Sequence, residues 1–431
     1  MKSNRRQFLS TCTAAGIIGR ASVATGEAQD VEQQVWPSTF PALRQRVNDH
    51  PLSFLDSAAT TLRPQSVIDA LVEYYSTDNA NPSRVHTLAS RAADRLSGAR
   101  QTLARFVNAA DPAEIIFVRG TTEGINLVAS TWGATNLKAG DEVVLTVAEH
   151  SSNLLPWTRA AGQAGAKVRV VDVDDDGRPR LDQFKELLSK RTRIVAFTHV
   201  SNVLGYVNPA REMCALAREV GARVVIDGAQ GAPHVKVDVQ DLGCDFYVFS
   251  GHKMLGPMGT GVIWGRRELL DAMPPYHVGS NMAHDVDFER ANFEHGALKF
   301  QAGTPDVAGP VGLAAAVRFF EAAGPLLRRH DDELVQYGLV RLAEIPRLRI
   351  IGPRKPDRRV PVFTFVLEGH APTTVARVLD ARGIAVRAGD MAALPLLKRF
   401  GAAEAVRASA YVYSTRGDID RLADALREIA K

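Results

Sequence analysis

The sequence has only three cysteines in 431 residues: Cys12, Cys214 and Cys244. Three cysteines cannot build a disulfide framework, and no pair shows metal-ligand spacing with nearby histidines, so we expect no metal site. No apolar run of about 18 residues or more occurs, which argues against a membrane-spanning helix. With 52 Lys and Arg against 48 Asp and Glu, the net charge of +4 gives no reason to expect a nucleic-acid partner.

The composition is that of a folded globular protein. Hydrophobic residues make up 45% of the chain and charged residues 23%, which argues against extensive disorder, a collagen-like repeat and a coiled-coil rod. A chain of 431 residues is long enough for one large α/β domain and a smaller second domain. The sequence shows no internal repeat and no low-complexity linker.

Residues 1–28 differ from the rest of the chain. Arg5 and Arg6 are followed by a mildly apolar stretch from Phe8 to Gly19, and then by small residues that suit signal cleavage. This segment resembles a twin-arginine signal peptide, so we expect export to the periplasm and no membrane contact after processing. The alternative is a disordered tail in which the arginine pair is incidental, and it would leave the protein in the cytoplasm.

Short apolar runs alternate with helical patterns along the chain. Seven runs are predicted as strands: Glu114–Val118, Glu142–Val147, Lys167–Val173, Arg193–Thr198, Arg223–Ile226, Phe246–Phe249 and Gly261–Trp264. Nearly continuous apolar strands separated by helices indicate a mostly parallel sheet that is buried on both faces. We expect an N-terminal segment over 29–56, a large α/β domain over 57–306 that contains this sheet, and a smaller α+β domain over 307–431.

A lysine stands directly after the sixth of these strands, in the run Ser250-Gly251-His252-Lys253. Burial lowers the pKa of a lysine amine, which frees the amine to form a Schiff base with an aldehyde. The preceding strand ends in Asp227, at the sheet edge where parallel sheets bind ligands. Asp227 can hold a pyridinium nitrogen, and Gln230 can reach a phenolic oxygen on the same ring. Taken alone, the lysine can simply reach solvent and Asp227 can cap the next helix.

Two other strands also end in polar residues. Thr121 and Thr122 open a helix after the first strand, where hydroxyls and backbone N–H groups suit one phosphate group. His150 follows the second strand, in Glu149-His150-Ser151-Ser152-Asn153, and its ring can stack on a flat ligand. Taken alone, the threonines are explained as a helix N-cap and the histidine as a structural residue.

In combination these runs resemble the class V aminotransferases, in particular their cysteine desulfurase and selenocysteine lyase branch. The shared motifs are, in chain order, G-T-T-E-G-I-N, E-H-S-S-N, S-N-V-L-G, D-G-A-Q, S-G-H-K and A-G-T-P. The similarity runs from about Phe54 to the final helix. It implies a fold-type I transferase that binds pyridoxal 5′-phosphate, acts on a small amino-acid-type substrate and forms a homodimer.

The resemblance also implies roles for individual residues. Lys253 would hold the cofactor covalently and move the substrate proton, and His150 would stack on the cofactor ring as the second catalytic residue. The other cofactor contacts would be Thr121, Thr122, Asn202, Asp227, Gln230, Ser250, His252 and, from the neighbouring subunit, Thr304. Arg407 would bind the substrate carboxylate with its guanidinium fork, and Arg387 would be a further substrate contact.

The sequence departs from the desulfurase pattern around the substrate. In desulfurases a loop of the form R-x-G-H-H-C carries the cysteine that takes the substrate sulfur. The matching residues here are 387–392, with Asp390 and Met391 in place of the histidines and Ala392 in place of the cysteine, and Ser83 replaces a further family histidine. We therefore expect retained cofactor chemistry with an altered substrate.

Neither Cys214 nor Cys244 lies in a comparable loop, and both are expected to be buried thiols. Three reaction outcomes stay open: a lyase reaction such as carbon–sulfur or related β-elimination, transamination, and epimerisation at Cα. The alternatives are a cysteine desulfurase with a non-standard sulfur acceptor, a desulfurase that has lost its activity, and a non-catalytic maturation module that keeps the fold.

Overall fold

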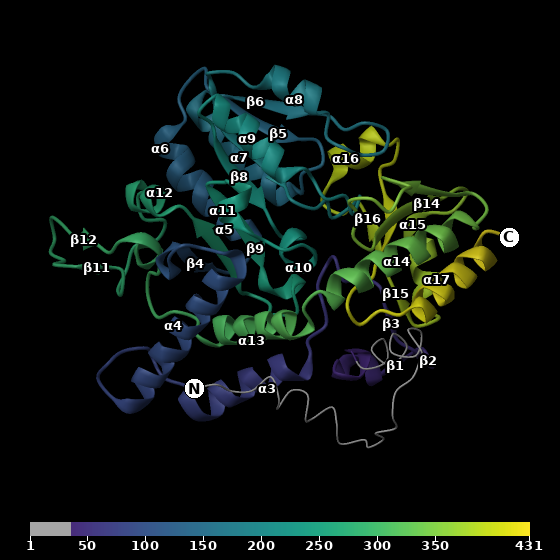
Figure 1. Cartoon of the computed structure of the whole chain (residues 1–431), viewed down its shortest axis with the longest axis horizontal. Helices are drawn as coiled ribbons and strands as arrows, with labels where there is room; N and C mark the ends of the chain where they lie inside the picture. Colours follow the sequence, from purple (N-terminus) through teal and green to yellow (C-terminus); the bar gives the residue numbers. More distant parts are fainter. Residues whose placement is uncertain (1–35) are drawn as a thin grey trace, which may run out of the picture.

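The computed structural model describes residues 36–431, so the expected signal peptide over 1–28 lies outside the described residues. Two domains lie side by side, one built on a seven-stranded sheet and the other on a four-stranded sheet (Figure 1). The chain ends on a helix of the smaller domain.

The large domain is built on the predicted sheet. Its strands are, in spatial order, β4 (Ile115–Val118), β10 (Gly261–Gly265), β9 (Phe246–Ser250), β8 (Arg223–Asp227), β7 (Thr192–Thr198), β5 (Glu142–Thr146) and β6 (Lys167–Val171). Strands β6, β5, β7, β8 and β9 are parallel, whereas β10 pairs antiparallel with both β9 and β4. The predicted fold class, a mostly parallel seven-stranded sheet of fold type I, is confirmed.

Both faces of this sheet are buried, as continuous apolar strands require. In β8, Val224 and Ile226 belong to one hydrophobic cluster and Val225 belongs to the other, since successive side chains point to opposite faces. The covering helices are α3 (Gln65–Glu73), α4 (Thr87–Val107), α5 (Thr121–Val128), α6 (Ala134–Asn136), α7 (Ser151–Ala164), α8 (Leu181–Leu187), α9 (Ala210–Glu219), α10 (Gly231–His234), α11 (Val239–Leu242) and α12 (Arg267–Ala272).

Helix α13 (Ala308–Ala323) belongs to the core of the large domain. It packs against α3 and α4 (Figure 1), and Leu313 and Val317 join the same cluster as the sheet. The expected domain boundary at residue 306 therefore falls before a helix that packs with the large domain. Among the helices of residues 36–431, none by itself combines the length and the apolar composition of a membrane span. Only α13 and α14 (Leu326–Ala343) taken together do, and they are bent by 80°.

The small domain has its own core around an antiparallel sheet. The strands are, in order, β13 (Leu348–Ile351), β14 (Val362–Leu367), β17 (Ala405–Ser409) and β16 (Arg387–Gly389). Helices α14, α15 (Pro372–Asp380) and α17 (Arg416–Ile429) cover it, and α16 (Leu394–Arg399) follows β16. Strand β3 (Ser53–Phe54) pairs in parallel with β15 (Ile384–Ala385), so the end of the segment expected over 29–56 packs with the small domain.

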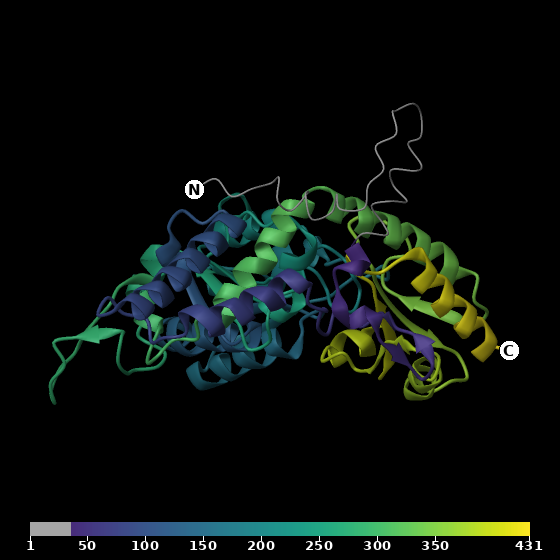
Figure 2. The same ribbon diagram turned by 90° about the horizontal axis from the view of Figure 1, so that it is seen from below.

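Two short hairpins complete the chain. Strands β1 (Arg46–Val47) and β2 (His50–Pro51) form the first, beside the small domain. Strands β11 (Ala283–His284) and β12 (Asn292–Phe293) form the second, which projects away from the body of the large domain (Figure 2).

Candidate active site

A cavity of about 430 Å³ lies between the two domains, at the carboxyl ends of the parallel strands. The large domain contributes the residues that follow β4, β5, β7, β8 and β9, and the small domain contributes Arg407 and the loop after β16. The predicted residues that line it are Thr121, Thr122, His150, Asn202, Asp227, Gln230, Ser250, His252, Lys253, Arg387 and Arg407. Residues that are distant in sequence are thus brought to one cavity of the size that small ligands occupy.

Lys253 and Asp227 form the charged centre of this cavity. Lys253 ends the single helical turn η5 (Gly251–Lys253) after β9, and burial lowers the pKa of its amine to about 8 while Asp227 opposes that shift. No hydrogen-bond partner holds the Lys253 Nζ among residues 36–431. Asp227 is 3% exposed and its Oδ1 accepts from the backbone N–H of Ala229 at 2.9 Å. Burial raises the pKa of Asp227, and the amine of Lys253 counteracts this.

His150 presents a neutral ring to the cavity. It is the N-cap of α7, where its Nδ1 accepts from the backbone N–H of Ser152 at 3.1 Å, so that the proton of the neutral ring is on Nε2. Burial, together with the positive charges of Lys253 and Arg407, lowers the pKa of His150 to about 4. The ring is therefore uncharged at neutral pH and is suited to stacking on a flat ligand.

The residue before His150 carries a buried carboxyl group. Glu149 is 1% exposed; its Oε1 accepts from Thr146 Oγ1 at 2.5 Å and its Oε2 from Asn153 Nδ2 at 2.7 Å. Burial raises the pKa of Glu149 to about 8, with Asp227 adding to the shift. Glu149 is thus largely protonated at neutral pH, which removes one negative charge from the surroundings of Asp227.

Four hydroxyl groups gather where α5 begins. Ser250 Oγ accepts from the backbone N–H of Thr121 at 2.8 Å and lies 2.8 Å from Thr121 Oγ1. Thr122 Oγ1 lies 2.8 Å from the hydroxyl of Ser152, a residue that sequence analysis did not single out. His252 lines the same end of the cavity. Hydroxyl and N–H donors at a helix N-terminus suit a phosphate group.

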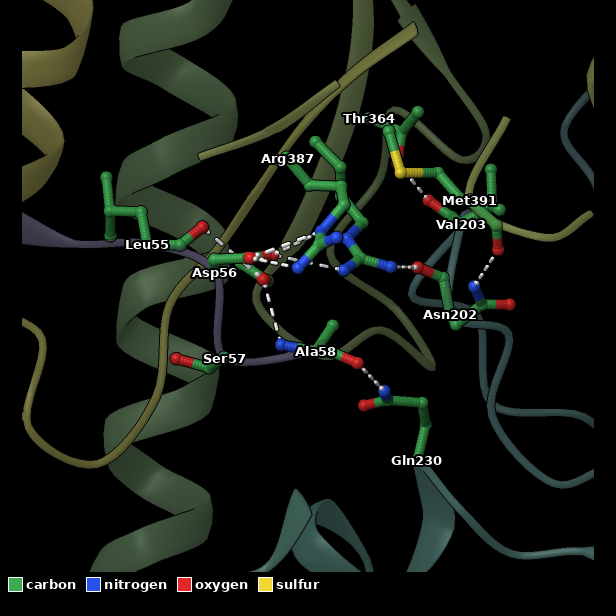
Figure 3. Close-up of polar contacts among 12 residues, drawn as sticks. Leu55, Asp56, Ser57, Ala58, Asn202, Val203, Gln230, Thr364, Arg387 and Met391 are labelled. Carbon is green, nitrogen blue, oxygen red and sulfur yellow. Dashed lines mark hydrogen bonds and ion pairs between the residues drawn. The ribbon is translucent and has the colours of Figure 1, made fainter. Parts of the chain in front are cut away.

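The two predicted amide side chains also face the cavity, and each is oriented by a backbone carbonyl. Gln230 Nε2 donates to the Ala58 carbonyl at 2.7 Å, and Asn202 Nδ2 donates to the Met391 carbonyl at 2.9 Å (Figure 3). An amide nitrogen has two hydrogens, so each side chain keeps one donor for a ligand. Their expected contact with a phenolic oxygen stays a prediction.

Asp56 joins the two predicted substrate arginines. Its Oδ2 pairs with Arg387 Nη2 at 2.8 Å (Figure 3). Its Oδ1 accepts from Arg407 Nη2 at 3.3 Å. Arg407 is 3% exposed and also donates to the Asn202 carbonyl at 3.1 Å, while its Nε has no partner within the part of the chain that is described. Burial lowers the pKa of Arg407 to about 10, against the effect of Asp56. A buried guanidinium with a free N–H is suited to bind a carboxylate.

Four residues from the sequence analysis do not line this cavity: Ser83, Thr304, Cys214 and Cys244. The expectation that Ser83 lies at the substrate is therefore not met within the described chain. Thr304 is exposed, and its contact with the cofactor of a neighbouring subunit stays a prediction. Cys214 and Cys244 are fully buried in the core of the large domain. Burial raises the pKa of Cys214 to about 12 and that of Cys244 well above its ordinary value, so both are unreactive thiols.

Comparison with known proteins identifies the family. The model of the class V aminotransferases matches residues 53–422. The chain is 47% identical over 392 residues to the cysteine desulfurase of Synechococcus elongatus, which covers 90% of this chain and 62% of that protein. It is 46% identical over 391 residues to the probable cysteine desulfurase of Halalkalibacterium halodurans. This match covers 90% of this chain and 96% of that protein. The chain thus spans about three fifths of the first relative and nearly all of the second.

Solved structures agree with this assignment. The S-sulfonic acid form of the Escherichia coli cysteine desulfurase superposes with a TM-score of 0.85 at 37% identity, covering 92% of this chain and 98% of that one. The apo cysteine desulfurase of Thermococcus onnurineus superposes with a TM-score of 0.87 at 34% identity. The superposition covers 95% of this chain and 99% of that one. The chain belongs to the class V aminotransferase family, whose members use pyridoxal 5′-phosphate as their cofactor.

Proposed function

We propose that this chain is an exported pyridoxal-phosphate enzyme that acts on an amino acid or an amino-acid-bearing metabolite by lyase or aminotransferase chemistry, without a persulfide on its own cysteine. The observation that carries the proposal is the cavity itself. The amine of Lys253, the carboxylate of Asp227 and the guanidinium of Arg407 face one space, and among residues 36–431 no thiol lines it.

The residues of the cavity fit pyridoxal 5′-phosphate. The unpartnered Lys253 amine suits the aldehyde, Asp227 suits the pyridine nitrogen, and the hydroxyl cluster around Ser250 suits the phosphate. The neutral ring of His150 provides an uncharged face for the flat cofactor. When bound, the cofactor supplies a conjugated ring that accepts the electron pair of a bond broken at the substrate Cα.

The protein's own groups then bind the substrate and move its proton. Arg407 orients the substrate by its carboxylate, because the buried guanidinium has a free N–H and is already fixed by Asp56 and the Asn202 carbonyl. Lys253, with a pKa of about 8, can both take and return a proton near neutral pH. Asp227 would hold the pyridine nitrogen of the cofactor, because it is buried at the end of β8 and the amine of Lys253 favours its charged form.

The cofactor chemistry is tested by the colour of the purified protein. The wild type should be yellow and should lose its visible band on borohydride reduction, which fixes the cofactor to its lysine. Lys253→Ala should have no such band, whereas Lys185→Ala, on the surface helix α8, should keep it. A colourless wild-type protein that takes up no added cofactor would instead support the non-catalytic alternative.

Cysteine desulfurase is the second candidate, because the relatives named above carry that name. The buried state of Cys214 and Cys244 argues against it, since neither thiol can reach a substrate in the cavity. The double variant Cys214→Ser, Cys244→Ser should turn over its substrate at the wild-type rate. A large loss of activity in a double variant that folds normally would favour a persulfide route and the desulfurase alternative.

The proposal includes a homodimer in which Thr304 reaches the neighbouring cofactor site. Thr304 adjoins the base of the projecting β11–β12 hairpin, where the Gly303 N–H donates to the Ser280 carbonyl at 2.8 Å. On that hairpin Val286 is 68% exposed and Phe288 is fully exposed, and a second subunit would cover these apolar side chains. Light scattering should give a dimer mass, and Thr304→Ala should weaken cofactor retention. A monomer with full cofactor occupancy would contradict this part.

Export is tested separately from catalysis. The twin-arginine resemblance predicts that Arg5→Lys with Arg6→Lys traps the precursor in the cytoplasm. Cell fractionation of the wild type and the variant measures this directly. A variant that still reaches the periplasm would overturn the export proposal and leave the cofactor chemistry untouched.

A further inference from the structure

The loop that follows β16 is a fixed wall of the cavity. The carbonyl of Met391 accepts from Asn202 Nδ2 at 2.9 Å, and the carbonyl of Ala392 accepts from the backbone N–H and the hydroxyl of Ser151 at 2.7 and 2.9 Å. The Met391 side chain is 7% exposed and packs with Val203 and other residues of the large domain. The loop belongs to the small domain, and these contacts fasten it to the large domain. It is therefore held in place beside the cavity.

This fixed loop presents a carboxylate to the cavity. Met391 and Ala392 have φ values of 53° and 52°, so the chain turns sharply after Asp390. The Asp390 Oδ1 stabilises the turn by accepting from the Ala392 N–H at 2.9 Å. Its other oxygen has no hydrogen-bond partner within residues 36–431, and the side chain is exposed where it lines the cavity.

Positive and negative groups are unevenly distributed along the cavity. Lys253 faces Asp227, and the two arginines at the substrate end share the single carboxylate of Asp56. This end therefore has one positive charge in excess, which the α-carboxylate of an amino acid neutralises. Asp390 forms no ion pair within the described part of the chain, and it lies close enough to His150 to influence that ring, which is itself uncharged at neutral pH.

We propose that Asp390 is a specificity-determining residue that selects amino-acid substrates with a positively charged side chain. The inference rests on the proposed function, because it assumes that the α-carboxylate binds at Arg407. A substrate ammonium group would then supply the missing partner of Asp390, through a charge-assisted hydrogen bond to its free oxygen. An acidic side chain would meet the same carboxylate and be repelled.

The test uses holoenzyme and follows the cofactor absorbance during titration with L-ornithine, L-lysine, L-norvaline and L-glutamate. L-norvaline has the carbon chain of L-ornithine without its side-chain amine, so this pair isolates the charge. We expect L-ornithine or L-lysine to bind at least about tenfold more tightly than L-norvaline, and L-glutamate to bind most weakly. Equal affinities, or a preference for L-glutamate, would overturn the inference and leave the proposed function intact.

Asp390→Asn is the matching variant, because an asparagine Oδ1 can keep the hydrogen bond from the Ala392 N–H. The preference for the charged side chain should fall to within about threefold in this variant, while binding of L-norvaline changes little. Asp174→Asn is the control, since Asp174 makes the same type of turn contact with the Asp176 N–H at 3.0 Å outside the cavity. An unchanged preference in Asp390→Asn would refute the assignment. No absorbance change with any of the four amino acids would refute this inference together with a free amino acid as the substrate.

Discussion

The lowered pKa of Lys253 predicts how the cofactor-free enzyme takes up its cofactor. Burial brings the pKa from 10.5 to about 8, even though Asp227 opposes the shift. At pH 7 roughly one amine in ten is then uncharged, against about one in three thousand for an ordinary lysine. The reactive fraction is therefore about 300-fold larger, and the rate of covalent cofactor uptake should rise with pH to an inflection near pH 8.

The assay mixes cofactor-free enzyme with limiting pyridoxal 5′-phosphate and records the rate of absorbance change at several pH values. Asp227→Asn removes the charge that raises the lysine pKa, so the inflection should move to lower pH. Arg407→Met removes a charge that lowers the pKa, so the inflection should move to higher pH. The measured quantity is the pH of the inflection. A variant that takes up less cofactor, and so gives a smaller absorbance change, can therefore still be compared with the wild type. A wild-type inflection above about pH 10, or one that stays fixed in both variants, would refute the reasoning.

The same shift has a consequence for stability, with a definite sign. Because the folded pKa of Lys253 is about 8 and the unfolded value is 10.5, the folded apoenzyme binds fewer protons between these pH values. Its free energy of unfolding should therefore rise with pH through this window, by at most about 3 kcal/mol. Lys253→Met should abolish the rise, which urea denaturation at the two ends of the window would measure.

Four further changes test other parts of the structure. Burial raises the pKa of Glu149 from 4.5 to about 8, so wild-type stability should fall as pH rises between these values, and Glu149→Gln should flatten that fall in urea denaturation. Asp56→Asn leaves Arg407 buried without an anion and should cost about 3 kcal/mol by the same method, part of which an amino-acid ligand restores. Gly205 has a φ of 65° and an added Cβ would lie 2.9 Å from a backbone carbonyl oxygen, so Gly205→Ala should cost about 1–3 kcal/mol in thermal unfolding. Ala392→Cys should not raise sulfide release from L-cysteine, because the carbonyl of residue 392 is held by two hydrogen bonds.

The sheet and the cofactor end of the cavity could be predicted because each rests on a local pattern. An apolar run such as Phe246–Phe249 predicts a buried strand, and the polar residues that follow it within one turn, including Lys253, are expected at the edge of the sheet. The observed strands match the predicted runs to within about two residues at each end. Local order along the chain therefore determines which side chains meet the cofactor.

Asp56 could not be found in this way. It lies on an isolated bridge with Ser409 instead of at the end of a strand of the large sheet, and its partners Arg387 and Arg407 are more than 300 residues away along the chain.

The packing of α13 could not be predicted from the sequence either. Residues 308–323 are compatible with a helix by sequence, but only the folded chain shows that this helix packs with the large domain. Long-range packing has no local signal in either case.

Asn202 links Arg407 to the loop that carries Asp390, the two parts of the cavity expected to contact the substrate. Its backbone carbonyl accepts from Arg407, and its side chain donates to the carbonyl of Met391. The position of the arginine that would bind the substrate carboxylate is therefore coupled to the loop that carries Asp390. A different residue in this loop changes what the cavity offers to the substrate side chain, while the contacts around Lys253 and Asp227 come from other strands and stay as they are. This separation allows one cofactor site to serve different substrates.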